Sequence, residues 1–582
     1  MGRPVTDTPP GRWSGLLPWV GAALGVLWYL LVGGGRTLDP TNLDWLGGGD
    51  HAQHVLGWLH VRGTPWGFPL GSTNTLVHPL SVSVGYTDSN PWVSVLLKPF
   101  SRWLPQDFQF IGPWLALCFA LQGALGVKLM ERLTPHATQR LLGACLFVLT
   151  PVLLSRSGHD TLCAHWLLLG MLWLHLRPRA DTRAAWRDVR GALLLNGLAA
   201  GIHPYLVVMV LTLTVALLYT LVRREHLLSA RAGGAALAGV LLEVGTLFFL
   251  FGYLGGGASL GAELGFGFFS ADMLALINPQ GWSKLLPTLP HGPGQYEGFG
   301  YLGTGALALA VVLLLSRPSS WWPRARETLM ARGPLALAVG ALTLAAFSTV
   351  MTVAGFKVLS LRGVTQALLP VLAPFRASGR FIWVLDYAML TGILGLVTWR
   401  WRERPRVATA LLLGAVLLQA LDTDDLWFRG RFHGEPWPRL RAPEWAHVDP
   451  SYRHIVLFPP AIKGLDSPCT DPGFPENAYV RFGDLAYRKG MTTNSAYLAR
   501  FDAVRLRAVC EALRADVESG RFAEDTLYVV DTKELAAFQR PESGLACGVL
   551  DGYTVCVATK EGRFREALLR AGAPPPSAGN PP

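Results

Sequence analysis

Long apolar runs separated by short connections fill most of the first 421 residues of this chain. A run of about 20 apolar residues is long enough to cross a bilayer as a helix, because each helical residue rises ~1.5 Å. Eleven such runs are expected as spans, at 14–34, 108–130, 140–155, 161–177, 190–203, 205–222, 232–254, 299–316, 333–353, 380–399 and 405–421. With 51% hydrophobic and only 16% charged residues, the chain is predicted to be an α-helical polytopic membrane protein with about 11 transmembrane helices.

Lys and Arg are concentrated in every second connection between these runs. The basic connections are 128–140, 177–190, 223–231, 317–332 and 400–406. Because cytoplasmic loops carry an excess of Lys and Arg, we expect them and the N-terminus on the cytoplasmic side, and the C-terminal part on the outer side. The formal net charge of +11 follows from these loops, so it indicates no nucleic-acid partner.

The connection 36–107 lacks a basic cluster and is expected as a large first outer loop within a transmembrane domain of residues 1–425. Apolar and polar residues after Gly49 alternate at helical spacing, which predicts a helix lying on the membrane interface. The apolar face holds Ala52, Val55, Leu56 and Leu59, and the polar face holds Asp50, Gln53, His54, Gly57 and His60. A second interfacial segment is expected at 91–104, where tryptophans favour the headgroup layer.

The hydropathy pattern stops near residue 426. Short apolar runs at 455–458 and 527–530 indicate buried strands, and 503–517 indicates a helix. The sequence therefore predicts a soluble extracytoplasmic α/β domain over 426–570. The tail 571–582 is rich in Pro, Gly and Ala, which is typical of disorder.

Four cysteines lie in this C-terminal region: Cys469, Cys510, Cys547 and Cys556. An even number in an oxidising compartment predicts one or two disulfides, although four cysteines allow three pairings. Cys547 and Cys556 are the closest in sequence. Four buried thiols are the alternative.

The segment Gly47-Gly48-Gly49-Asp50-His51-Ala52-Gln53-His54 follows the first span. A carboxylate at a membrane surface is costly and is usually kept for function, so Asp50 is a candidate catalytic acid or base. The alternative is that Asp50 caps a helix, since Asp after glycines and before an amphipathic run is an ordinary N-cap.

Several strings, together with the outer loops and the C-terminal domain, resemble an uncharacterised bacterial branch of the GT-C superfamily of polyprenyl-phosphate-dependent glycosyltransferases. They are Gly49-Asp50-His51-Ala52-Gln53-His54, Tyr86-Thr87-Asp88-Ser89, Gly158-His159-Asp160, Tyr296-Glu297-Gly298-Phe299 and Arg376-Ala377-Ser378-Gly379-Arg380-Phe381-Ile382-Trp383. The resemblance covers about residues 14–421. It implies an inverting transferase that moves a sugar from a polyprenyl-phosphate donor to a lipid, glycan or protein acceptor at the outer face.

The resemblance also implies roles for individual residues. Asp50 would take the proton of the acceptor hydroxyl, which is otherwise a weak nucleophile. Asp160 would be a second acid that positions the acceptor or a divalent metal. The expected substrate-binding residues are His51, His54, Asp88, His159, His203, Tyr296, Glu297, Arg376 and Arg380.

Each binding residue has a structural alternative. Arg376 and Arg380 lie four apart, on one face if the stretch is helical, and would bind the lipid phosphate; ordinary snorkelling to the headgroups is the alternative. Tyr296 and Glu297 would hydrogen-bond sugar hydroxyls, against plain loop packing. For His203 the break at Pro204 is a sufficient explanation. His51 and His54 are more often interfacial or packing histidines than ligands.

A divalent metal is permitted but not predicted, because no fixed-spacing signature unites the ligands. The side chains concerned are Asp50, His51, His54, Asp88, His159, Asp160 and His165.

Two rival functions follow from the same features. One is a transporter or flippase for a lipid-linked substrate, with Glu243 inside a span as part of the pathway, although no paired repeats are visible. The other is a catalytically inactive scaffold of the same fold. The sequence has no Walker loop, Rossmann fingerprint, zincin helix or nucleophile elbow in a credible context, so a nucleotide-driven pump is not expected.

Overall fold

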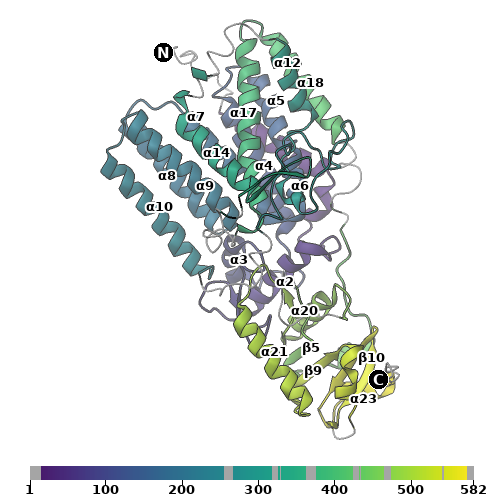
Figure 1. The fold of residues 1–582 in the computed structure, drawn as a ribbon. Coiled ribbons are helices and arrows are strands. Elements are labelled where there is room, and N and C mark those ends of the chain that lie inside the picture. The colour runs from purple at the N-terminus through teal and green to yellow at the C-terminus, as the bar shows by residue number, and fades with distance from the viewer. Residues whose placement is uncertain are drawn as a thin grey trace. The chain divides into compact units, whose positions relative to one another are not determined.

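The computed structural model of the protein describes residues 15–254, 266–316, 326–327, 330–361, 363, 375–423, 432, 434–463, 473–540 and 543–572. The chain forms two compact units (Figure 1). The helical unit comprises Met1–Pro40, Phe110–Leu247 and Ala262–His433, and the loop-and-sheet unit comprises Thr41–Gln109, Phe248–Gly261 and Gly434–Pro582.

The helical unit contains a helix at each of the eleven expected spans. They are α1 (Leu17–Leu31), α4 (Ile111–Met130), α5 (Ala137–Val148) with α6 (Pro151–Ser155), α7 (Trp166–Leu176), α8 (Thr182–Ala200), α9 (Pro204–Tyr219), α10 (Ala230–Leu250), α12 (Thr304–Leu315), α14 (Gly333–Phe347), α17 (Ile382–Arg400) and α18 (Pro405–Asp422). Short 3-10 turns precede or join several of these helices: η1 (Gly34–Leu38), η3 (Arg156–Gly158), η4 (Asp160–Cys163), η6 (Gln295–Gly298) and η9 (Ser378–Phe381). A π-helical turn, η5 (Thr220–Arg224), continues α9, and strands β3 (Val350–Val353) and β4 (Phe356–Ser360) form a hairpin after α14.

Within the described residues, six helical segments are long and apolar enough to cross a membrane. They are Ile111–Met130, Ala137–Gly158, Pro204–Arg224, Ala230–Leu250, Ser378–Arg400 and Pro405–Asp422. Leu17–Leu31, Thr304–Leu315 and Gly333–Phe347 are shorter apolar helices. The protein is therefore a mostly helical membrane protein, and the total of about eleven spans stays a prediction.

The expected span 190–203 is wrong at its start, because α8 begins eight residues earlier. The side chain of Asp181 accepts a hydrogen bond from the backbone N–H of Ala184 at 2.7 Å and caps the helix. The first turns carry Arg183 and Arg187, which are exposed. Hydropathy registers only the apolar half of such a helix, so its polar half was assigned to a loop.

The loop-and-sheet unit is built on a five-stranded mixed sheet of order β10-β11-β9-β5-β7 (Figure 1). The strands are β5 (His454–Phe458), β7 (Thr492–Thr493), β9 (Thr526–Val530), β10 (Ala546–Leu550) and β11 (Tyr553–Val557). β5 pairs in parallel with β7 and β9, whereas β11 pairs antiparallel with β9 and β10. The expected strands at 455–458 and 527–530 are confirmed as β5 and β9.

Helices and short pairings complete this unit. The helices are α2 (Gly49–Gly63), α3 (Pro91–Leu97), α20 (Ala478–Lys489), α21 (Ala503–Glu518), α22 (Leu535–Phe538) and α23 (Arg563–Ala571), and the 3-10 turns are η2 (Lys98–Phe100), η10 (Pro443–His447) and η11 (Thr532–Glu534). β1 (Ser72–Thr73) pairs with β2 (Val82–Ser83), and β6 (Ile462–Lys463) pairs with β8 (Ala496–Tyr497). The expected helix 503–517 is confirmed as α21. The expected domain start at 426 and most of the expected disordered tail, residues 573–582, lie outside the described residues.

The disulfide between Cys547 and Cys556 is present and joins directly opposed residues of β10 and β11. Cys118, Cys145 and Cys163 are buried and form no disulfide. Cys469 lies outside the described residues. One of the sequence-based pairings is therefore confirmed.

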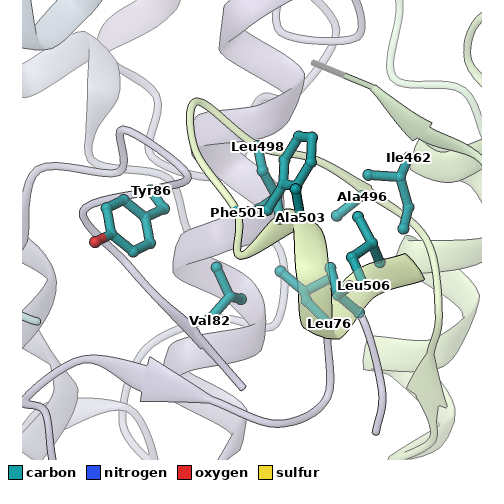
Figure 2. Close-up of a cluster of buried hydrophobic side chains, with 10 residues drawn as sticks. Leu76, Val82, Tyr86, Ile462, Ala496, Leu498, Phe501, Ala503 and Leu506 are labelled. Atoms are coloured by element: carbon teal, nitrogen blue, oxygen red, sulfur yellow. The ribbon is translucent and has the colours of Figure 1, made fainter. Parts of the chain in front are cut away.

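The first outer loop and the C-terminal region share one hydrophobic core (Figure 2). Leu76, Val77, Val82 and Tyr86 of the loop pack with Ile462, Ala496, Leu498, Phe501, Ala503 and Leu506, each at most 9% exposed. Burying a Leu or Val side chain contributes roughly 1.5–3 kcal/mol. The loop is thus folded together with the α/β region, and most of its apolar side chains do not depend on a membrane for burial.

Helix α2 is not the interfacial helix expected from its amphipathic pattern. Its polar face is as buried as its apolar face, with Gln53, His54 and His60 at most 3% exposed. The polar groups bond to protein instead: Gln53 Nε2 donates to the Tyr86 carbonyl at 3.3 Å, and Ser89 Oγ donates to the His54 carbonyl at 2.7 Å. A polar helix face indicates that the helix needs polar partners. Here the partners are groups of the folded first outer loop and not lipid headgroups.

We predict that Leu506→Ala lowers the free energy of unfolding of the loop-and-sheet unit by about 2–5 kcal/mol, because it leaves a cavity in the shared core. Val504 lies in the same helix at 77% exposure, so Val504→Ala should change it by at most about 0.5 kcal/mol. Hydrogen exchange in Leu506→Ala should rise in residues 72–86 as well as in α21. Faster exchange confined to α21 would contradict a shared core.

Candidate functional site

Three connections of the helical unit meet at an ion-pair cluster of Arg156, Glu297 and Arg380. Arg380 donates through Nε and Nη2 to the two carboxylate oxygens of Glu297, at 3.0 and 2.8 Å. Arg156 donates through Nη1 to Glu297 Oε2 at 2.8 Å and through Nη2 to the Tyr296 carbonyl at 3.0 Å. Both arginines are 8% exposed. One carboxylate from η6 therefore orders two buried guanidinium groups, one from η3 and one from η9.

Two glycines next to these charges allow the close approach of η6 and η9. A Cβ on Gly379 would lie 2.7 Å from the Gly298 Cα, and a Cβ on Gly298 would lie 2.4 Å from the Ala271 Cα. Real Cβ atoms do not approach backbone so closely. In Glu297-Gly298 and in Gly379-Arg380, the charged residue is next to a glycine in the sequence. The two glycines allow η6 and η9 to come close enough for Glu297 and Arg380 to form their ion pair.

Aromatic rings fix the orientation of both arginines. The Arg380 guanidinium lies 4.7 Å from the Tyr205 ring centre, and that of Arg156 lies 5.1 Å from the Trp383 ring centre. The Tyr205 hydroxyl accepts a hydrogen bond from the Ala377 backbone N–H at 2.8 Å. Tyr205 lies in the first turn of α9 and Trp383 in the first turn of α17, so the starts of two apolar helices line the cluster.

The cluster keeps Glu297 ionised. Burial alone would raise the pKa of the Glu297 carboxyl, but the charges and hydrogen bonds of Arg380 and Arg156 outweigh it and hold the pKa well below its ordinary range. Glu297 is therefore a permanent anion with both oxygens occupied, which suits a residue that positions arginines.

His203 and His159 lie next to the cluster. His203 is the N-cap of α9, where its Nδ1 accepts from the Tyr205 backbone N–H at 3.2 Å, and its ring centre lies 5.5 Å from that of Tyr205. The His159 and His203 rings are 5.6 Å apart. Asp160 is fully buried at the start of η4, and its carbonyl accepts from Trp114 Nε1 at 3.0 Å. His203 thus has the local structural role that its sequence context suggested.

Arg376 and Tyr296 are the more accessible candidates. The stretch 376–380 is not one helix, since η9 begins at Ser378, so Arg376 and Arg380 do not share a helix face. Arg376 is partly buried, whereas Tyr296 is 53% exposed. Of the candidates in the helical unit, Tyr296 has the side chain most open to contact.

Asp50 lies in the loop-and-sheet unit, in the first turn of α2. The N-cap of this helix is Gly48 and not Asp50, so the capping alternative is wrong in its simple form. Gly49, with a φ of 57°, turns the chain into the helix. Asp50 is only partly buried, and the positive end of the helix dipole favours its charged form. A carboxylate held at the rigid start of a buried helix is suitably placed to accept a proton.

His51, His54 and Asp88 accompany Asp50 in this unit. The His51 ring lies 5.1 Å from the Trp45 ring, and His54 is 1% exposed. Asp88 has a φ of 53°, and its neighbours Thr87 and Ser89 hydrogen-bond to each other through their hydroxyls at 2.8 Å. Backbone strain of this kind persists only where surrounding contacts impose it.

These three residues are the candidates for holding a divalent cation in this unit. Ligand atoms of His51 and His54 lie within 4.8 Å of one another, and so do those of His54 and Asp88. Imidazole and carboxylate groups are donors that zinc and similar ions accept, and His54 is the residue common to both pairs.

Helix α2 is docked on α20 of the C-terminal region. Its His60 bonds through Nε2 to the Gly483 carbonyl at 2.9 Å and through Nδ1 to Thr75 Oγ1 at 2.8 Å. Burial lowers the pKa of His60 to about 4, so the ring is neutral at neutral pH. Burial also raises the pKa of Tyr479 in α20, and the charge of Asp50 raises it further. The helix that carries Asp50 is thus bonded to α20 of the C-terminal region through His60.

Sequence reasoning did not single out Arg156 or Tyr205, and it named Trp383 only as the end of a longer string. The sequence did contain a feature that could have indicated Arg156. It is an ionisable residue at the end of an apolar run, and burying such a residue is costly unless it has a partner of opposite charge. Its distance from Glu297, 141 positions along the chain, hid the partner.

A helical membrane protein with a sheet-containing C-terminal domain is the class that these elements define. Residues 22–424 match the family described as Domain of unknown function (DUF6311), and residues 444–558 match the DUF6311 C-terminal domain. The chain belongs to this family.

No curated protein matches the chain. Among solved structures, the single-particle cryo-EM structure of the arabinofuranosyltransferase AftD from Mycobacteria is similar, with 13% identity and a TM-score of 0.43. The similarity covers 94% of this chain and 40% of that chain, so the chain spans less than half of the length of AftD. A similarity this low supports no argument about the activity of the chain.

We predict that Glu297→Gln lowers the free energy of unfolding of the helical unit by about 3–5 kcal/mol, because two buried guanidinium groups lose their counter-charge. Glu403→Gln is the matched control: Glu403 is 85% exposed in its ion pair with Arg402, so the change should be at most about 1 kcal/mol. Denaturant titration in detergent measures both. Equal, small effects would show that the cluster does not stabilise the unit.

We predict that the loop-and-sheet unit loses stability as the pH falls from about 6.5 to about 4, because unfolded His60 takes up a proton that folded His60 excludes. The loss should approach about 3 kcal/mol at pH 4. His60→Gln should remove that part of the pH dependence, whereas His447→Gln, at an exposed position of the same unit, should not. Urea titration at a series of pH values tests this, and an unchanged slope in His60→Gln would contradict it.

Proposed function

We propose that this chain is an inverting membrane glycosyltransferase of the GT-C type. It transfers a sugar from a polyprenyl-phosphate donor to a lipid, glycan or protein acceptor at the outer face of a bacterial inner membrane. The proposal rests on the sequence resemblance of its motifs to that superfamily and on the local geometry of those motifs.

The observation that carries the proposal is the position of Asp50. A general base must be ionised, reachable and rigidly held. Asp50 is partly exposed in the first turn of α2, while residues 52–62 of the same helix are buried. The helix dipole favours the ionised carboxylate.

The arginines of the helical unit supply the second half of the proposed chemistry. Arg156, Arg376 and Arg380 carry three positive charges, and Glu297 neutralises one of them. Arg156 Nε is buried and has no hydrogen-bond partner among the described residues, so a donor remains for an anion. Arginine suits phosphate because its planar group donates two parallel hydrogen bonds. In this proposal Glu297 positions Arg156 and Arg380, and Arg376 and Tyr296 face the donor.

The reaction balances without a further reagent. The carboxylate of Asp50 takes the proton of the acceptor hydroxyl while its oxygen forms a bond to the anomeric carbon. The bond from that carbon to the lipid phosphate oxygen breaks, and the phosphate leaves with the electron pair. The arginines stabilise the charge that develops on the phosphate. Attack opposite the leaving group inverts the anomeric configuration.

We predict that Asp50→Asn and Asp50→Ala each lower sugar transfer by about 10²–10⁴-fold, since both remove the base. Transfer of labelled sugar from a polyprenyl-phosphate donor by the purified full chain measures the effect. Asp44→Asn is the matched control, an exposed acid six positions earlier in the same segment, and should keep the wild-type rate. Activity that survives both Asp50 changes would remove Asp50 from the mechanism.

The same preparation separates this function from the transporter alternative. Movement of the lipid-linked sugar across vesicles without any transfer product would support a transporter. In that alternative Glu243 is part of the pathway; its carboxylate lies against Gly197 of α8, where a Cβ would be 2.6 Å from its Oε1.

A further inference from the structure

A cavity of about 300 Å³ lies within the helical unit, at the end of α9 that is remote from Tyr205. Its lining includes Leu176, Arg177, Arg179, Glu225, Arg332 and Leu335. These residues belong to the ends of α7 and α9 and to the start of α14. The lining comes from the basic connections expected at 177–190, 223–231 and 317–332 or from residues within seven positions of them, so all three meet at one end of the unit. The positive-inside rule makes this the cytoplasmic end.

A fully buried arginine forms the floor of the cavity. The Arg179 side chain is 1% exposed and donates through Nε to Asp188 Oδ2 at 2.6 Å and through Nη1 to Glu225 Oε1 at 2.9 Å. Its Nη2 donates to the Leu174 carbonyl. Because it is buried, Arg179 does not snorkel to the membrane surface. Its two carboxylate partners offset the cost of burial.

Two further arginines at the rim retain unused donors. Arg177 donates through Nη1 to Asp188, and its guanidinium lies 4.8 Å from the Trp173 ring centre. Arg332 donates through Nη1 to the His175 carbonyl, and among the described residues no carboxylate lies within salt-bridge distance of it. A guanidinium group has five N–H donors, so each of these arginines has several left for a ligand. The three arginines exceed the two carboxylates by one positive charge.

The surroundings of the cavity are those of a headgroup site. The candidate span Pro204–Arg224 and the apolar helix Gly333–Phe347 both end at the cavity, which sets it at the level where spans leave the bilayer core. Leu176 and Leu335 add apolar lining. Basic pockets between membrane helices on the cytoplasmic side bind anionic headgroups, and the cytoplasmic leaflet supplies anionic lipids.

We propose that this cavity binds the phosphate of an anionic phospholipid headgroup. Arg177 and Arg332 bind the phosphate oxygens directly, and Arg179, fixed by Asp188 and Glu225, supplies the positive floor. The site is independent of the sugar transfer proposed above, because none of its residues belongs to that chemistry.

Native mass spectrometry of the full chain released from nanodiscs tests the proposal, with phosphatidylglycerol and phosphatidylcholine as probes. Wild type should retain phosphatidylglycerol preferentially. The double variant Arg177→Gln with Arg332→Gln should weaken its retention about tenfold or more, since two charge-assisted contacts are lost. The double variant Arg183→Gln with Arg187→Gln removes the same charge at exposed positions of the neighbouring helix and should retain the lipid as wild type does. Equal loss in both double variants would overturn the site in favour of a general charge effect.

Two additional arms complete the test. Leu335→Trp fills the cavity without changing its charge and should also weaken retention, so the proposal stays testable if the arginine variant does not fold; normal retention in Leu335→Trp would overturn it. Inorganic phosphate at millimolar concentration should not displace the lipid. Displacement by phosphate alone, with no preference between the two lipids, would assign the site to a soluble phosphate instead.

Discussion

Charge burial is the constraint on which the helical unit depends. A guanidinium group in an apolar bundle needs a counter-charge nearby, since desolvation otherwise outweighs any contact it makes. At one end of α9, Glu297 joins Arg156 and Arg380, and at the other, Asp188 and Glu225 hold Arg179. Each set ties together connections far apart in the sequence. The helix ends are therefore ordered by ion pairs, while apolar packing orders the helix bodies.

The loop-and-sheet unit depends on a different arrangement. Its first outer loop has no hydrophobic core of its own and packs its apolar side chains into the core of the C-terminal region. The two-stranded pairing of β1 and β2 is too small to be stable alone. Its apolar residues are buried against α21 and its neighbours, and α2 is docked on α20 through His60. This fixes the segment that carries Asp50, and it links the candidate base to the C-terminal region rather than to the membrane.

Hydropathy located a helix at every expected span, because a long apolar run has few other stable states in a membrane protein. It failed at α8, where a capped polar half precedes the apolar half, and at α2, where an amphipathic pattern was interpreted as an interfacial helix. Both errors arise because polarity shows that a face needs polar partners and does not show whether lipid headgroups, water or protein supply them. The strands β5 and β9 were found because each contains a short apolar run, which is fully buried in β9 and mostly buried in β5.

For the site, the sequence determined which residues are candidates for function. These are Asp50 after its glycines and the charged residues of Glu297-Gly298 and Gly379-Arg380. The sequence also showed that every second connection between the helices is basic. Only the tertiary structure decided which of them meet. Arg156 and Glu297 are 141 positions apart, and the cavity at the other end of α9 draws Arg177 and Arg179 from one connection, Glu225 from a second and Arg332 from a third. The sequence pattern of one segment indicates which faces of that segment need apolar or polar partners. Ion pairs and close approaches depend on distances between segments, which are set only when the helices pack.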